Sequence, residues 1–366
     1  MHVNFDLSET QRLFQATTER FAGAVDVSMR HSIRSMVGSY DKKRWHELTE
    51  LGLLSIGAST EFDGLDGSLT DLSVIAETLG VNNALDPWLE NGAFPVRLGN
   101  IAANDKLLKA ILDGDQLASV AFAEKNNRYE LFPNSTLITT LDDHSGFLLN
   151  GEKSFVLSGA LADILLVTAQ HNGEFGIYHV AANSDGIDTH YYRLADGSQA
   201  TTVTFKQVKL PLDARLTIDF EQFQDVIAEI NVLCCSEMLG LSQLLLNDTI
   251  SYVKEREQFG VTIGSFQAIQ HGLVDCYSEL EQMRSLLFRT LLLENKSGEQ
   301  WRADVMGAKA FIGEGADLIA RTAVQFHGAM GITDEVSIGH AMKRIMLLSR
   351  LFGDVANNLK HYARNT

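Results

Sequence analysis

Three short segments in the second half of the chain carry side chains that could hold a negatively charged nucleotide. They are residues 256–260, 266–270 and 325–335. The Arg256 guanidinium can pair with two oxygens of a diphosphate, and the Phe259 ring can pack on an adenine or a ribose. The alternative for Arg256 is a solvated arginine beside a helix C-terminus, which the helix dipole favours. Arg256 alone therefore does not establish a nucleotide site.

The segment from Gln325 to Gly331 adds two glycines and a side-chain amide to this group. Glycines allow a ligand to approach the backbone closely, and the Gln325 amide can donate hydrogen bonds. This combination suits the pyrophosphate of a dinucleotide without a Rossmann fold. The plainer alternative is that Gly328 only ends a helix.

Long helices must position these segments. The apolar pattern predicts helices over residues 223–255, 265–295 and 303–324, and a fourth before Arg350. Four such helices indicate a bundle.

The first two thirds of the chain have a different texture. Residues 1–117 are expected to be helical, and Ser8 and Gln11 form the pattern of a capped first helix. Between residues 118 and 217, short apolar pieces alternate with Asn, Asp and Gly, which predicts strands and turns. The predicted fold is thus α+β and multi-domain: an N-terminal helical domain (1–117), a middle β-barrel or sandwich (118–217) and a C-terminal four-helix bundle (218–366).

Composition excludes several classes of partner. The net charge of −17 argues against binding to nucleic acid. We expect no signal peptide and no membrane span, since no apolar run approaches the ~20 residues that a spanning helix needs. Of the three cysteines, Cys234 and Cys235 lie in an apolar helical run, where we expect small buried hydrophobes. Together with Cys276 they indicate neither a disulfide framework nor a metal site, which fits a cytoplasmic protein.

The three segments and the predicted order of domains resemble the acyl-CoA dehydrogenase flavoproteins over nearly the whole chain. The resemblance implies FAD as cofactor, α,β-dehydrogenation of an acyl-CoA substrate, and an electron-transfer flavoprotein as acceptor. In that family, these segments reach across a subunit interface to the ADP half of a neighbour's FAD. The residues so matched here are Arg256, Phe259, Gln267, Gln325 and Gly328. Ala329 departs from the family, which usually has a second consecutive glycine at that position.

Elsewhere the resemblance is weaker. Phe155 and Val156 match the family's aromatic and aliphatic residues beside the flavin ring, but Leu157 occupies the position of a hydroxyl residue that bonds the flavin. In the companion segment, residues 123–130, only Glu124 is retained.

The family's usual general base is also missing from its expected position. In most of the family it is a Glu before a Gly-Thr pair, and the corresponding residue here is Phe352. Some members place the base near the start of the long helix, where this chain has Ile230 beside Glu229. Glu229 is therefore the first candidate for the catalytic base and Asp354 the second. The alternative for each is an ordinary surface or helix-cap acid.

This distribution suggests three hypotheses. The first is a partner subunit of an α2β2 heterotetramer, which contributes FAD-binding residues to a catalytic homologue. It resembles the small-subunit branch of bacterial acyl-CoA dehydrogenases, which acts on dicarboxylyl-CoA or steroid side-chain CoA in lipid or steroid degradation. The second is a catalytic homotetramer with Glu229 as base. The third is a flavin-free acyl-CoA binding or scaffold subunit.

Overall fold

The computed structural model describes residues 6–23, 29–30, 40–125, 129–293 and 296–365. The chain forms two compact units, and each draws on separate stretches of sequence. Unit 1 consists of Met1–His31, Ser68–Leu85 and Asn231–Thr366, and unit 2 consists of Ser32–Gly67 and Asp86–Ile230. The domain boundaries expected from the sequence stay a prediction.

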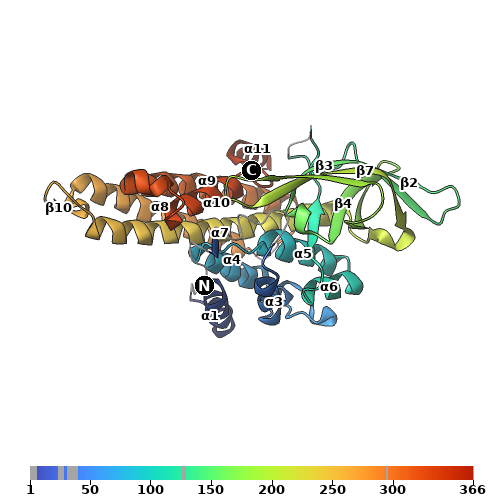
Figure 1. Ribbon diagram of the computed structural model, residues 1–366, viewed down its shortest axis with the longest axis horizontal. Coiled ribbons are helices and arrows are strands. Elements are labelled where there is room, and N and C mark those ends of the chain that lie inside the picture. Colours follow the sequence, from blue (N-terminus) through green and yellow to red (C-terminus); the bar gives the residue numbers. More distant parts are fainter. Residues whose placement is uncertain (1–5, 24–28, 31–39, 126–128, 294–295, 366) are drawn as a thin grey trace. The chain divides into compact units, whose positions relative to one another are not determined.

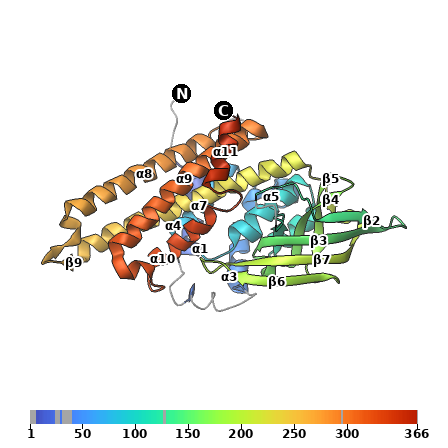
Figure 2. The same cartoon turned by 90° about the horizontal axis from the view of Figure 1, so that it is seen from above.

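Unit 1 is helical apart from one short hairpin (Figures 1 and 2). Its helices are α1 (Glu9–Ala22), α4 (Leu69–Val81), α7 (Phe220–Glu255) from Asn231 onward, α8 (Gln267–Leu291), α9 (Gly298–His327), α10 (Ser337–Leu348) and α11 (Val355–Asn365). The hairpin is β9 (Glu257–Gln258) with β10 (Val261–Thr262), and short 3-10 turns lie at Ile263–Ser265 (η6) and Gly328–Ile332 (η7). Helix α9 packs against α8, α10 and α11.

The observed bundle confirms the predicted long helices, although α7 and α9 are longer than expected and α8 is shorter. Helix α9 begins at Gly298, five residues before the predicted start, because Trp301 in its first turn is buried and extends the apolar face. Helix α11 was not expected, since its eleven residues are too few for periodicity to distinguish them from a terminal tail.

Helix α7 is the core element of unit 1. Among the described residues it is the one helix long and apolar enough to cross a membrane, yet 78% of its apolar window is buried inside the protein. Cys234 and Cys235 lie in this window as buried free thiols, as the sequence predicted. Length and apolarity here reflect a core helix.

The N-terminal helices attach to the bundle through polar contacts. The predicted capping box of α1 is present, with Ser8 and Gln11 each bonding the other's backbone. The Gln11 side chain also donates to Asp71 at 3.0 Å. On α4, the Ser73 hydroxyl meets the Ser236 hydroxyl of α7 at 2.7 Å in a buried position. Residues far apart in sequence thus share one core.

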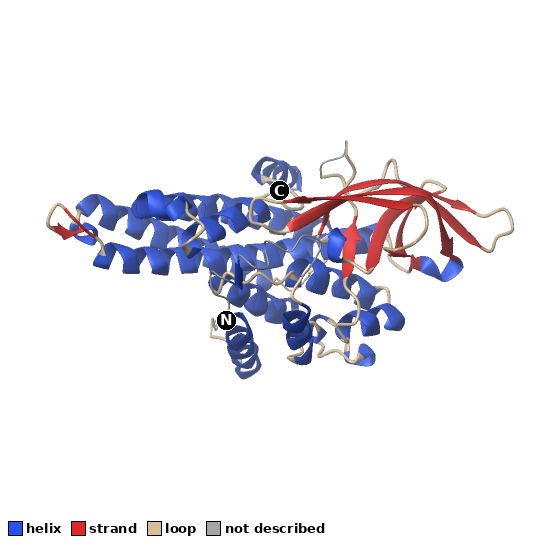
Figure 3. Ribbon diagram, viewed as in Figure 1, coloured by secondary structure: helices blue, strands red, loops and turns tan. Residues whose placement is uncertain are grey.

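Unit 2 combines short helices with a sheet (Figure 3). Its helical elements are α3 (Lys42–Glu50), η1 (Ser55–Gly57), η2 (Thr60–Phe62), the π-helical turn η3 (Trp88–Ala93), α5 (Phe94–Ile101) and α6 (Asp105–Leu112). The buried Trp88 indole donates to the Leu53 carbonyl at 2.9 Å, and Arg44 pairs with Asp86 at 2.8 Å. These bonds connect chain segments on either side of α4.

The sheet has eight strands: β1 (Ala118–Ala121), β2 (Leu137–Thr140), β3 (Gly146–Leu157), β4 (Ile164–His171), β5 (Glu174–Ala181), β6 (Ile187–Arg193), β7 (Gln199–Pro211) and β8 (Arg215–Leu216). Their order is β6-β7-β3-β2-β4-β5-β8, with β1 parallel to the first half of β4. The expected barrel or sandwich is thus one sheet connected throughout by backbone pairing. Its side chains enclose a core that includes Leu149, Val156, Tyr178 and Phe205.

Candidate functional site

The five residues expected to bind the ADP half of an FAD all lie in unit 1. Arg256 follows the last residue of α7, Phe259 lies in the turn between β9 and β10, and Gln267 begins α8. Gln325 is in the last turn of α9, and Gly328 begins η7. All five are exposed to solvent. We refer to these five residues as the donor end.

Two contacts bring the three helix ends together. The Tyr252 ring, near the end of α7, stacks on His327 at the end of α9, with centroids 4.3 Å apart and an interplanar angle of 22°. At the start of α8, Gly272 faces the Phe326 ring, and a Cβ at this position would lie only 2.8 Å from it. A side chain at position 272 would displace the Phe326 ring, so this glycine lets α8 and α9 approach. The three sequence segments that carry these residues therefore lie close together in space.

The polar side chains of the donor end are not used by the fold. Within the described part of the chain, the side chains of Arg256, Gln267 and Gln325 form no hydrogen bond or ion pair. Two other arginines of unit 1 behave differently: Arg284 pairs with Glu77 and Arg344 with Glu237, at 2.7 and 2.6 Å. The donor end thus presents a cation and two amides that remain available to a ligand.

Backbone and apolar groups complete this surface. Gly328 has φ +62°, and nothing lies within 4 Å of the position where a Cβ would be, so a ligand can approach its backbone. Phe259 is 92% exposed and Ile332 69%, unusual values for large apolar side chains. The residues fit the phosphates and the adenosine of an ADP group.

In unit 2, the predicted flavin-ring residues lie at an irregularity of β3. The pairing of β3 with β7 shifts between Lys153 and Val156, and Phe155 has φ +56°. This bulge leaves the Phe155 ring 37% exposed and buries Val156 in the core of the sheet. Phe155 is therefore the one of the two whose side chain a ligand can reach directly.

Glu124 is retained from the family pattern, but the fold uses it. Its carboxylate accepts hydrogen bonds from the backbone amides of Asn134, Ser135 and Thr136 at 2.8–3.0 Å. It also accepts one from Lys153 Nζ at 3.0 Å. Glu124, Lys153 and residues 134–136 are hereafter the Glu124 clamp.

The clamp is electrostatically strong. Burial alone would raise the pKa of Glu124, but the charge of Lys153 and the hydrogen bonds outweigh burial and lower this pKa to about 2. Lys153 is fully buried, and it also donates to Phe122 O and Thr168 Oγ1, both at 3.1 Å. Burial lowers the pKa of Lys153 to about 8, although Glu124 acts in the opposite direction. Both charges are occupied with holding the loop.

Glu229, the first candidate for the base, is engaged in a similar way. Its two oxygens accept from Arg97 Nε and Nη2 at 2.7 and 2.9 Å, in a bidentate pair on unit 2. Burial lowers the pKa of Arg97, but the hydrogen bonds and charge of Glu229 outweigh it and the pKa is raised overall. Arg97 also donates to the Gly57 carbonyl at 3.1 Å, so the pair connects α7, α5 and η1.

The other two residues weighed for the base lie together in unit 1. Phe352 has φ +56° and is partly buried. Asp354 precedes α11, and its side chain accepts from the Asn357 amide at 2.9 Å, which is the position and bond of a helix cap. A phenyl ring cannot accept a proton, and the carboxylate beside it caps a helix.

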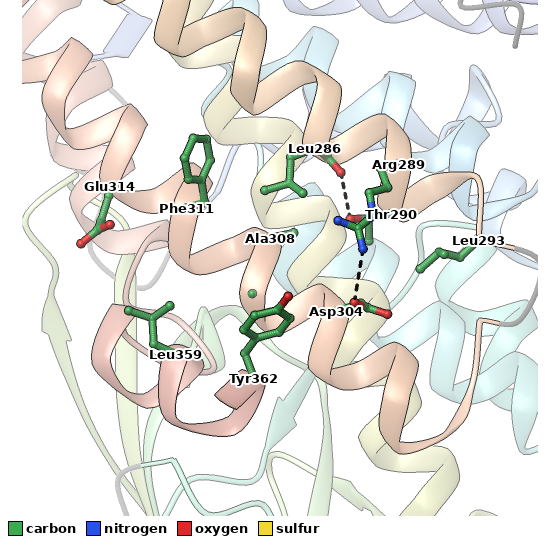
Figure 4. Close-up of a pocket in the computed structure, with 11 residues that line it drawn as sticks. Leu286, Arg289, Thr290, Leu293, Asp304, Ala308, Phe311, Glu314, Leu359 and Tyr362 are labelled. Carbon is green, nitrogen blue, oxygen red and sulfur yellow. Dashed lines mark hydrogen bonds and ion pairs between the residues drawn. The ribbon is translucent and has the colours of Figure 1, made fainter. Parts of the chain in front are cut away.

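A cavity of about 250 Å³ lies elsewhere in unit 1, between α8, α9 and α11 (Figure 4). Its apolar lining includes Leu286, Phe311 and Tyr362, and Arg289 faces Asp304 across 3.9 Å. No residue of the donor end lines it. It is therefore separate from the expected nucleotide site.

Sequence reasoning missed the polar residues that act inside the fold, above all Arg97, Lys153 and Lys309. Lys309 in α9 is buried, and its amino group donates to backbone carbonyls of the Phe352 loop. A signal was present for Lys309, because it stands between alanines on the apolar face of a helix. Nothing in the sequence marked its acceptors.

Comparison with known proteins identifies the family. Residues 8–115 match the N-terminal domain of acyl-CoA dehydrogenases, and residues 220–365 match their C-terminal domain. The short-chain specific acyl-CoA dehydrogenase of Megasphaera elsdenii is 25% identical over 93% of this chain and 94% of its own length.

Solved structures show the same fold. In the ChsE4-ChsE5 complex from Mycobacterium tuberculosis, the similarity covers 99% of this chain and 98% of the other, with 20% identity and a TM-score of 0.86. A structure of PigA with FAD and proline is similar over 99% and 98% of the two chains, with 21% identity and a TM-score of 0.87.

Members of this family bind FAD and are oxidoreductases that act on CH–CH bonds. Two domain matches at the two ends of the chain, and relatives aligned over nearly its full length, leave one assignment: the chain belongs to the acyl-CoA dehydrogenase family.

Proposed function

We propose that this chain is the partner subunit of a heteromeric, FAD-dependent acyl-CoA dehydrogenase. In this role, the donor end holds the ADP half of an FAD whose ring belongs to a catalytic homologue in an α2β2 assembly. When bound, FAD supplies a hydride acceptor for α,β-dehydrogenation of an acyl-CoA substrate. An electron-transfer flavoprotein would then receive the electrons.

One observation carries the proposal: the polar side chains matched to a neighbour's FAD are free of bonds within the described chain, whereas the retained acids are bound by other residues of the fold. Arg256, Gln267 and Gln325 are exposed and form no side-chain bonds within the described part of the chain. Glu229, the first candidate for a base of the chain's own, is held by Arg97, and Glu124, the retained residue of the companion segment, is held by Lys153. A complex of two named chains among the similar structures supports a heteromeric assembly.

Co-purification with a homologous subunit tests this proposal. The donor end predicts a complex that holds about one FAD per two chains, as expected for a site shared within a symmetric assembly. Arg256→Gln in this chain should reduce the FAD content of the complex. A homo-oligomer of this chain alone that carries one FAD per chain and full dehydrogenase activity would refute the proposal.

The second candidate function is a homotetramer with Glu229 as the general base. It has a carboxylate of the correct type in the first third of α7, but both carboxylate oxygens already accept from Arg97. A base in this arrangement must first give up its bonds to Arg97, because both carboxylate oxygens are occupied. Glu229→Gln that abolishes turnover while FAD stays bound would support this candidate, and unchanged turnover would exclude it.

The third candidate, a flavin-free acyl-CoA binding or scaffold subunit, predicts no flavin absorbance in any purified assembly. The exposed Arg256, Gln267 and Gln325 argue against it, because their side chains form no bond within the described part of the chain. An absorbance spectrum of the purified complex separates this candidate from the first two.

A further inference from the structure

The buried lysine of α9 belongs to no ion pair or ligand site considered so far. Lys309 is 1% exposed, and its side chain extends to the loop between α10 and α11. Its amino group donates to the Leu351 carbonyl and, in a longer contact of 3.4 Å, to the Gly353 carbonyl. The two acceptors flank a single residue, Phe352.

The conformation of Phe352 requires support of this kind. Its φ of +56° lies in the left-handed region, which a large side chain seldom adopts without surrounding constraints. The Phe352 ring lies with its centroid 5.8 Å from Lys309 Nζ. One amino group therefore contacts the backbone on both sides of this residue and also approaches its side chain.

The rest of the loop is fixed from the other side. Asn358 of α11 is fully buried, and its side-chain amide donates to the Gly353 carbonyl at 3.0 Å. The Asn358 backbone amide donates to the Asp354 carbonyl at 2.9 Å. Two helices thus hold the loop through bonds to its backbone.

Burying an amine is unfavourable unless its hydrogen bonds are satisfied. Burial lowers the pKa of Lys309, although Cys234, Cys235 and Asp354 all act to raise it. A methionine or leucine would fill the same space without this cost. The lysine is therefore explained by what its amino group binds.

We propose that Lys309 is the positioning residue of the Leu351–Asp354 loop, whose two carbonyl contacts hold residue 352 in the left-handed conformation whatever its side chain is. This inference rests on the proposed function in one respect: position 352 is where the family resemblance places the general base. In this chain the loop keeps a fixed conformation, and Phe352 occupies the position of the carboxylate.

The first test follows the loop itself and needs no activity. 4-Fluorophenylalanine at position 352 should give one sharp 19F resonance in the full-length protein. Lys309→Met should broaden or split this resonance, while the resonance of the same label at Phe288 in α8 stays unchanged. Thr290→Val, which removes another buried donor of unit 1, is the matched control and should leave both resonances unchanged.

Hydrogen exchange provides the second measurement. Lys309→Met should speed amide exchange of residues 351–358 at least about tenfold, while exchange in α7 and α8 changes less than about twofold. Phe352→Asn, in contrast, should leave the loop protected. The proposal is wrong if Phe352→Asn loosens the loop and Lys309→Met does not, or if Lys309→Met loosens all helices equally. If Lys309→Met fails to fold, Lys309→Gln, a smaller change at the same position, replaces it under the same criteria.

A kinetic test links the loop to the reaction. In a complex that carries Phe352→Glu, adding Lys309→Met should lower kcat at least about tenfold with KM within about twofold, because a displaced base acts poorly on bound substrate. Equal kcat with and without Lys309 overturns the positioning role. If Phe352→Glu adds no turnover while the 19F and exchange results are as expected, the assignment of position 352 fails and the positioning of the loop stands.

Discussion

The donor end of unit 1 and the Glu124 clamp of unit 2 use charged groups in opposite ways. At the donor end, Arg256 is exposed and its side chain forms no bond within the described part of the chain. In the clamp, Glu124 accepts four backbone and lysine bonds and Lys153 is fully buried. Residues that a fold needs are satisfied internally, and those that it does not need are available to a ligand. The two regions thus differ in whether their charged groups are open to a ligand.

The largest expected effect is on the clamp. Lys153→Met leaves the Glu124 carboxylate buried without its cation, which should lower the free energy of unfolding of unit 2 by about 3–5 kcal/mol. Urea unfolding followed by circular dichroism measures the loss. Lys206→Met, at an exposed position on β7, is the control and should change stability by less than about 0.5 kcal/mol.

Removing both charges refines the same comparison. Lys153→Met with Glu124→Gln should recover part of the stability, because no uncompensated buried charge remains. A loss below about 1 kcal/mol for Lys153→Met alone would show that the clamp is no stronger than a surface ion pair.

Acid should release the clamp. The pKa of Glu124 is about 2 in the folded protein, against an ordinary value of 4.5, so its contribution is complete above pH 4.5 and is lost as pH falls through 2. The expected loss is about 3 kcal/mol, since each unit of pKa shift corresponds to about 1.4 kcal/mol. Lys153 is protonated in both states over this range and adds no slope.

The measurement is the free energy of unfolding between pH 5 and pH 2, compared between the wild type and Glu124→Gln. Between pH 5 and pH 2, Glu124→Gln should lose about 3 kcal/mol less stability than the wild type. Parallel curves for the two proteins would mean that the acid sensitivity arises from other carboxylates.

The sequence predicted helices and their caps better than the polar bonds inside the fold. The long helices and the capped start at Ser8 followed from local patterns. Arg97 with Glu229 and Lys153 with Glu124 did not, because 132 and 29 residues separate the partners and their pairing depends on the tertiary fold. Glu229 therefore looked like a free acid in the sequence, whereas the structure shows it bound.

The sequence also did not show which helices belong to which of the two compact units. Helices α1 and α4 belong with the C-terminal helices, while α3, α5 and α6 belong with the sheet. Local patterns give each helix and its apolar face, but they do not state which core that face joins. For the same reason, the left-handed conformation of Phe352 could not be expected from its side chain.

Arg256→Gln tests the donor end. In contrast to the clamp variants, it should change FAD affinity rather than stability, and by a smaller free energy. Stability should change by less than about 0.5 kcal/mol. FAD should bind about 10–100 times more weakly to the heteromeric complex, because a charge-assisted hydrogen bond contributes about 1.5–3 kcal/mol. Isothermal titration of FAD into apo-complex measures this change. Arg321→Gln, which removes an exposed arginine of α9, should leave the affinity unchanged.

Phe259→Ala has the smallest expected effect and separates an apolar contribution from a charged one. The ring is 92% exposed, and its partner within the chain is the edge of Phe266 at a centroid distance of 6.4 Å. Its removal should therefore leave the melting temperature unchanged. If the ring packs on the adenosine of an FAD, affinity should fall about fivefold, equivalent to about 1 kcal/mol for one aromatic contact. Tyr277→Ala, at another exposed ring in α8, should have no effect on FAD. An equal effect of both variants would mean that exposed rings of this unit stabilise the assembly generally, and the donor end would then be defined by Arg256 and its amides alone.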